Sequence, residues 1–180
     1  MEYKYILELL KAGLYEEFYA DFKNCLIPFQ KPQNYGRNIL ENSSFLVSSV
    51  FPDKKIHGNG FVARLSGSTA EFLEMWLIMN VGPAPFFLDN NKLNLKFNPR
   101  LAGWLFDKRG EYSFNFLSKI RITYHNPKRK DTFGKNPAGI TKIILRLKDK
   151  PIEITSPVIP APHAQAIRSR QIQKIDIYLE

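Results

Sequence analysis

The stretch Ser66–Phe97, "SGSTAEFLEMWLIMNVGPAPFFLDNNKLNLKF", changes its hydrophobic period part-way along. Ser68, followed three residues later by Glu71, forms a capping box that opens onto a run of apolar residues and predicts the start of a helix. Pro83 and Pro85 end that helix. Beyond them apolar and polar residues alternate, and "FFLDNNKLNLKF" predicts two strands joined by an Asp-Asn-Asn turn. The stretch therefore separates a helical part of the chain from a β part.

The helical part precedes this stretch. Residues 1–25 place apolar side chains at helical spacing, and Gly13 predicts a break between two helical pieces. Residues 28–44 predict a loop, and "FLVSSVF" after them fits a helix or a strand. The helix that follows Ser68 is apolar nearly all round beyond its first turn, so we expect it to be buried on most faces, with Phe72 and Trp76 inside.

The β part follows from residue 86, where apolar side chains alternate along short segments. "KIILRLKDKPIEI" predicts a hairpin that turns at residues 148–150. The predicted fold class is α+β, with a helical segment at 1–85 and an antiparallel β-sandwich at 86–180. In three segments we expect one buried face each, made of Tyr112, Phe114 and Phe116; of Ile120, Ile122 and Tyr124; and of Ile175, Ile177 and Leu179.

Composition excludes several classes of protein. An apolar fraction of 44% argues against disorder, and the single Cys25, expected to be a small core residue, cannot form an internal disulfide. Charged residues run through "MEYKYILELLKAGLYEE", which excludes a signal peptide. The longest apolar run, Phe72–Leu88, is broken by Glu74 and two prolines, so we expect no membrane span and a cytoplasmic protein.

Positive charge is concentrated in the second half of the chain. Residues 92–150 hold 15 Lys and Arg against 4 Asp and Glu, whereas residues 1–80 hold 8 against 9. Such a basic region could contact nucleic acid. However, most of these lysines alternate with apolar residues, as on the solvated face of a sheet, and no nucleic-acid-binding motif occurs. We expect no nucleic-acid partner and no membrane partner.

Two polar segments are candidate sites. At the start of the helix, free backbone N–H groups and the helix dipole favour an anion, and Gly67, Ser68 and Thr69 with Arg64 and His57 could complete a phosphate site. The alternative is a plain capped helix with Arg64 in solvent. The segment "YGRNILENSSF" groups side chains suited to a sugar, Tyr35, Arg37, Glu41, Asn42 and Ser43; the alternative is a loop that satisfies its own backbone.

Six segments together resemble the C-terminal part of the cellobiose-phosphorylase-like inverting glycoside phosphorylases, over roughly residues 10–180: "GRNILENSSF", "HGNGFVARLSGSTAEFLEMW", "GWLF", "TYHNP", "IPAPHAQAIR" and "IDIYL". The resemblance implies that residues 1–85 are the last part of an (α/α)6 barrel and residues 86–180 its β-sandwich appendage. It also implies phosphorolysis of β-glucosides or β-oligoglucans to a sugar 1-phosphate, with inorganic phosphate as co-substrate and no cofactor or metal.

The resemblance assigns the phosphate to Ser66, Gly67, Ser68 and Thr69, with Arg64 and His57 as further partners, and it matches Glu41 to an acid that contacts the acceptor sugar. The family's general acid is an aspartate upstream of this region, and no aspartate here lies in a matching motif: Asp21, Asp53, Asp89, Asp107, Asp131, Asp149 and Asp176. We therefore expect a C-terminal fragment of the enzyme that is inactive alone, with the missing N-terminal part as a separate partner chain. The alternative is a non-catalytic carbohydrate-binding or assembly module.

Overall fold

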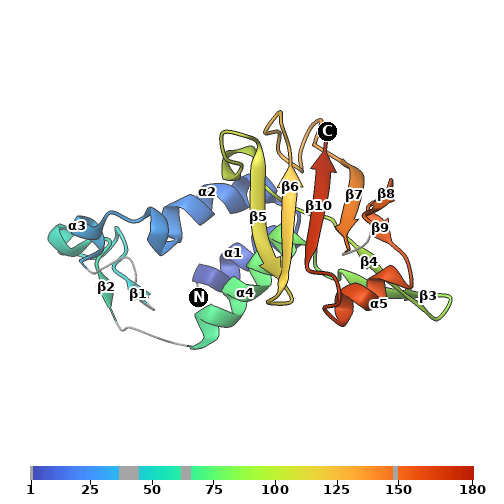
Figure 1. The fold of residues 1–180 in the computed structure, drawn as a ribbon. Coiled ribbons are helices and arrows are strands. Elements are labelled where there is room, and N and C mark those ends of the chain that lie inside the picture. The colour runs from blue at the N-terminus through green and yellow to red at the C-terminus, as the bar shows by residue number, and fades with distance from the viewer. Residues whose placement is uncertain (1, 37–44, 62–65, 148–149) are drawn as a thin grey trace. The chain divides into compact units, whose positions relative to one another are not determined.

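The computed structural model describes residues 2–36, 45–61, 66–147 and 150–180. The fold is α+β, and the chain forms two compact units, Met1–Trp76 and Leu77–Glu180, whose boundary falls within helix α4 (Ser66–Asn80). Figure 1 shows the helices gathered in the first part of the chain and the long strands in the second. The division lies earlier than the predicted boundary between residues 85 and 86.

The end of α4 explains this earlier boundary, because its last residues are bonded to the β unit. The Tyr124 hydroxyl donates to the Asn80 carbonyl at 2.6 Å. The amides of Asn98 and Arg100 donate to the carbonyls of Val81 and Met79, both at 2.8 Å. These hydrogen bonds join the end of the helix and the residue after it to strand β6 (Ile120–His125) and to the segment that follows β4 (Lys92–Lys96).

The first unit is mainly helical, as predicted. Gly13, with φ of +80°, separates the first two helices and confirms the predicted break. The segment "FLVSSVF", whose sequence fits a helix or a strand, begins with the short strand Phe45–Leu46. This strand pairs antiparallel with Gly60–Phe61, the strand before α4. In order, the elements before α4 are α1 (Glu2–Lys11), α2 (Tyr15–Cys25), η1 (Ile27–Phe29), α3 (Pro32–Tyr35), β1 (Phe45–Leu46), η2 (Lys54–Ile56) and β2 (Gly60–Phe61).

Helix α4 is less buried than its apolar sequence predicts. Met75 is fully buried, but Phe72 and Leu73 are 38% and 60% exposed and Trp76 is half-buried, so the expected burial of Phe72 is wrong. Lys11 of α1 pairs with Glu74 of α4 at 2.9 Å. In the described part of the chain no helix is long and apolar enough to cross a membrane.

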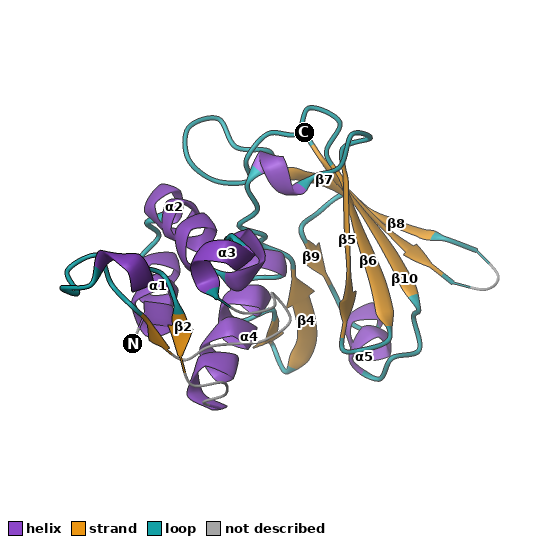
Figure 2. Ribbon diagram, turned by 90° about the vertical axis from the view of Figure 1, so that its left-hand side faces the viewer, coloured by secondary structure: helices purple, strands orange, loops and turns teal. Residues whose placement is uncertain are grey.

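The second unit holds a five-stranded sheet in the order β5-β6-β10-β7-β8 and a three-stranded sheet in the order β3-β4-β9. Figure 2 shows β4 and β9 to one side of the larger sheet. The elements are β3 (Phe86–Asp89), β4 (Lys92–Lys96), η3 (Gly103–Leu105), β5 (Glu111–Phe116), β6 (Ile120–His125), β7 (Ile140–Arg146), β8 (Ile152–Ile154), β9 (Val158–Ile159), α5 (His163–Arg168) and β10 (Lys174–Leu179).

The larger sheet is not purely antiparallel, which corrects the sequence prediction. Strand β10 pairs antiparallel with β7 but parallel with β6, in the register Ile175 to Ile122. Parallel neighbours need a long crossover, and the chain between them includes β7, β8, β9 and helix α5. The last strand therefore lies in the middle of the sheet.

The predicted hairpins and buried faces are confirmed where the structure describes them. Strands β3 and β4 pair around Asn90 and Asn91, whose φ values of 47° and 58° suit a tight hairpin turn. Strands β7 and β8 pair antiparallel, and their predicted turn, at residues 148–149, lies outside the described residues. The aligned apolar side chains form the core: Phe114, Phe116, Ile120, Ile122, Tyr124, Ile175, Ile177 and Leu179 are all buried, and Tyr112 is half-buried.

Candidate functional site

The predicted phosphate turn is the first turn of α4. The helix begins at Ser66, three residues before Thr69, where the capping box predicts its first residue, so Ser68 lies within the helix and is not its N-cap. Serine and glycine are tolerated in a first helical turn, which is why the capping signal misplaces the boundary. The free N–H groups of a 15-residue helix therefore belong to the Ser-Gly-Ser-Thr sequence itself. Thr69 is exposed.

His57 directly follows the short helix η2 and contacts its own loop. Its Nε2 lies 2.7 Å from the Phe51 carbonyl oxygen. A carbonyl can only accept, so Nε2 carries the hydrogen, and in the neutral ring Nδ1 is an acceptor. His57 could donate to an anion through Nδ1 only when the imidazole is protonated. The partner predicted beside it, Arg64, lies outside the described residues.

Tyr35 is the one predicted sugar residue that the structure describes. It ends helix α3, just before Gly36 with φ of +70°, and it is 1% exposed. A sugar stacks only on an exposed aromatic face, so this placement does not support a stacking role for Tyr35. The other predicted sugar residues, Arg37, Glu41, Asn42 and Ser43, lie outside the described residues.

Residues next to two of the predicted site residues, Tyr35 and His57, lie against each other. A Cβ added to Gly36 would lie 3.7 Å from Oδ1 of Asn59, and one added to Gly58 would lie 3.8 Å from the Asn34 carbonyl. The Gly58 amide also donates to Val47, and the Val47 amide to Asn59. The end of α3, which leads into the predicted sugar segment, is therefore packed against the loop that holds His57.

A second polar cluster lies on the outward face of the five-stranded sheet and is absent from the sequence prediction. His125 places Nε2 3.3 Å from Asp176 and Nδ1 3.5 Å from Glu111. Nε of Arg146 donates to Asp176 at 2.7 Å, and the Asp176 side chain is 3% exposed. The His125 ring also stacks on Tyr178, with the ring centroids 4.6 Å apart.

The sequence carries only a faint signal for this cluster. Asp176 is a charged residue between Ile175 and Ile177 in an otherwise regular strand, which suggests a partner across the sheet. That partner could not be named, because His125 and Asp176 are 51 residues apart and meet through the unexpected parallel pair.

Charge interactions decide the ionisation of Asp176. Burial alone would raise the pKa of this carboxyl group, but hydrogen bonds from Arg146 and His125 and the charge of Lys174 outweigh it, so the pKa is lowered from its ordinary value of 3.8. Asp176 is therefore a carboxylate at neutral pH. Among the described residues no group of three or more His, Cys, Asp and Glu side chains could hold a metal ion.

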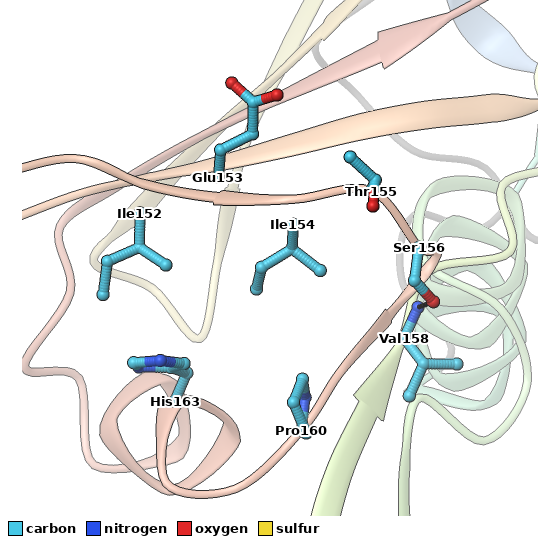
Figure 3. Close-up of a pocket in the computed structure, with 8 residues that line it drawn as sticks. All are labelled: Ile152, Glu153, Ile154, Thr155, Ser156, Val158, Pro160 and His163. Atoms are coloured by element: carbon cyan, nitrogen blue, oxygen red, sulfur yellow. Dashed lines mark hydrogen bonds between the residues drawn. The ribbon is translucent and has the colours of Figure 1, made fainter.

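A cavity of about 580 Å³ opens between strand β8 and helix α5. Figure 3 shows Ile152 and Ile154 pointing into it toward His163 and Pro160, while Glu153 points away. Within the described part of the chain the His163 imidazole has no hydrogen-bond partner. Its apolar wall is formed by Ile152, Ile154, Val158 and Pro160, and Thr155, Ser156 and His163 supply polar side chains beside it.

Cys25 is not an activated nucleophile. It is half-buried at the end of α2, and burial, followed by a hydrogen bond and the charge of Glu2, raises the pKa of its thiol to about 12. The thiol is therefore protonated at neutral pH, and a protonated thiol is a poor nucleophile.

Comparison of the sequence with protein-family models finds no match, and comparison with curated proteins finds none either.

Proposed function

We propose that this chain carries the phosphate and sugar contacts of a glycoside phosphorylase that acts on β-glucosides or β-oligoglucans. The observation that supports the proposal is the packing of Asn34–Gly36 against Gly58–Asn59, because these residues flank Tyr35, a predicted sugar residue, and His57, a predicted phosphate partner. The sequence resemblance assigned the two segments these roles separately. A phosphorylase needs both ligands at one place, since the phosphate oxygen must reach the anomeric carbon.

The chemistry fits the residues assigned to each step. A phosphate oxygen attacks the anomeric carbon, the glycosidic bond breaks, and the leaving oxygen takes a proton from a carboxylic acid. Attack by an anion is favoured when its charge is held in place by N–H groups and a guanidinium, as Ser66–Thr69 at the start of α4 and Arg64 would do. Phosphate replaces the activated water of ordinary inverting hydrolysis, so one acid is enough. We place that acid in a part of the enzyme outside this sequence.

Arg64→Ala tests the phosphate half of the proposal. Removing a guanidinium that binds a dianion should weaken inorganic phosphate binding by about 1.5–3 kcal/mol, measured by titration calorimetry. Lys55→Ala is the matched control, because it removes one exposed cation from the neighbouring η2 and should leave the affinity nearly unchanged.

Equal losses in the two variants, or no loss in either, would contradict the assignment of Arg64. The same titrations also distinguish the alternative function. A non-catalytic carbohydrate-binding module would bind cellobiose with equal affinity in all three proteins and would bind no phosphate.

A further inference from the structure

Three cations lie side by side on the outward face of the five-stranded sheet. Lys174 of β10 is the register partner of Arg121 of β6 and of Arg146 of β7. The three side chains leave the same face, because Ile122, Leu145 and Ile175, the next residue on each strand, form a buried row on the other. Figure 1 shows β6, β10 and β7 as neighbours. We call Arg121, Lys174 and Arg146 the cationic row.

Such a row costs stability unless its charge is compensated. Like charges directly opposite each other on neighbouring strands repel. Asp176 compensates part of the charge, since it accepts from Nε of Arg146 at 2.7 Å and lies 3.7 Å from Nζ of Lys174. Arg121 is exposed, and its guanidinium has no ion pair or hydrogen bond with the described residues. One carboxylate against three cations leaves a net charge of +2.

Asp176 also fixes the direction of two of these cations. Its side chain is 3% exposed, while those of Arg146 and Lys174 are 45% and 54% exposed. The buried carboxylate therefore accepts a hydrogen bond from Nε of Arg146. This leaves the terminal guanidinium nitrogens for solvent or a ligand. Neighbouring strands are about 4.8 Å apart, so the backbones of Arg121 and Arg146 are separated by about 10 Å, and both long side chains can reach one small anion between them.

We propose that the cationic row binds a dianionic phosphoryl group, either inorganic phosphate or the head of a phosphate monoester. A dianion neutralises the net charge of the row, and the two guanidinium groups match its oxygens. This site is separate from the one proposed at the start of α4. The face does not suit a nucleic-acid strand, because its aromatic ring, Tyr178, is already stacked on His125 and covered by Lys142, whose Nζ lies 4.7 Å from the ring centroid.

The test uses the full chain with Arg64→Ala, so that the site proposed at α4 is weakened. Inorganic phosphate and glycerol 1-phosphate are titrated while the backbone amides are followed by NMR. We expect shifts at Arg121, Lys174 and Arg146, and at least tenfold weaker binding of dimethyl phosphate, which carries a single negative charge. Shifts confined to other segments, or equal affinity for dimethyl phosphate, would overturn the proposal.

Arg121→Gln and Lys119→Gln are the matched variants in this background. Both remove one exposed cation, and they lie two residues apart, but only Arg121 belongs to the row. We expect a fivefold to tenfold loss of phosphate affinity for Arg121→Gln and less than a twofold change for Lys119→Gln. Equal losses of affinity in the two variants would mean that phosphate binding depends only on the overall charge of the protein. That result would refute a specific site at the cationic row.

Vesicles containing phosphatidic acid identify the source of the phosphoryl group. Vesicle binding that needs Arg121 and exceeds the affinity for glycerol 1-phosphate would point to a lipid headgroup. Stronger binding of the free monoester would point to a soluble ligand. If neither probe binds in an Arg121-dependent way, the proposal is wrong.

Discussion

Asp176 shows how one buried charge can organise a sheet face. Arg146, His125 and Lys174 come from three strands, and all converge on its carboxylate. A buried carboxylate is costly unless it is well paired, and here the pairing lowers its pKa despite the burial. The network therefore stabilises the ionised form and ties β6, β10 and β7 together at the outward surface.

Asp176→Asn should destabilise the protein by about 1–3 kcal/mol at neutral pH, because it weakens charge-assisted hydrogen bonds to a nearly buried group. Urea unfolding measures the loss. Glu153→Gln, an exposed carboxylate on the adjacent β8, is the matched control and should change stability by less than about 0.5 kcal/mol. Equal effects of the two substitutions would show that the network adds no stability.

The Asp176→Asn variant should also change how the stability of the protein depends on pH. Since the pKa of Asp176 in the folded protein lies below 3.8, the unfolded chain binds this proton more readily. The stabilisation is therefore complete above about pH 5 and is lost as the pH falls through 3.8 toward the lower folded pKa. Asp176→Asn should flatten this acid loss in unfolding curves, and an unchanged slope would contradict the network.

At the scale of elements, the short helix η3 depends on a close backbone contact. A Cβ on Gly103 would lie 2.0 Å from the carbonyl oxygen of Arg129, and the Gly103 amide donates to Oδ1 of Asp131 at 2.6 Å. The segment "GWLF" and the loop after β6 therefore pack backbone to backbone, an approach that no side chain would permit.

Gly103→Ala should cost about 3 kcal/mol, the upper range for overpacking, because backbone atoms must move apart. Gly139→Ala is the control, since a Cβ there meets nothing within 4 Å and the residue does not need a left-handed φ. Thermal unfolding compares the two variants. A Gly103→Ala protein as stable as Gly139→Ala would mean that this contact is wrong.

Strands that follow from the local alternation of apolar and polar residues were predictable from the sequence. The neighbours of these strands in the sheet were not. The alternation in "EYSFNF" and "KIDIYL" gave the correct buried faces, because a strand directs every second side chain to one side. The position of β10 between β6 and β7 depends on contacts between distant segments. The exposure of Phe72 also depends on what packs beside α4, which the composition of the helix does not reveal.

At the scale of the whole molecule, the order of helices followed by strands was predicted, and the compact units divide between Trp76 and Leu77, before the predicted boundary at residue 85. Tertiary hydrogen bonds to Asn80 and Val81 move the end of α4 into the β unit, and no local signal encodes them. The candidate site was less predictable still. The sequence named the two candidate segments, but only the fold places Gly36 beside Asn59.

The full chain should release no glucose 1-phosphate from cellobiose or longer β-glucans in the presence of phosphate. The reason follows from the proposed function, in which the acid that protonates the leaving oxygen lies outside this sequence. A coupled assay for glucose 1-phosphate checks this. Phosphorolysis by the pure chain would contradict the expectation and would direct attention to Glu41 as the acid.

The most direct measurement is an NMR titration of the isotope-labelled chain with inorganic phosphate and, separately, with cellobiose. The Arg121→Gln variant is used, so that the cationic row contributes little. We predict amide shifts at Ser66–Thr69 and His57–Asn59 with phosphate, and at Asn34–Gly36 with cellobiose, with the phosphate shifts lost in Arg64→Ala. If neither ligand perturbs these segments, or if Arg64→Ala leaves the phosphate shifts unchanged, the proposed phosphorylase site is contradicted.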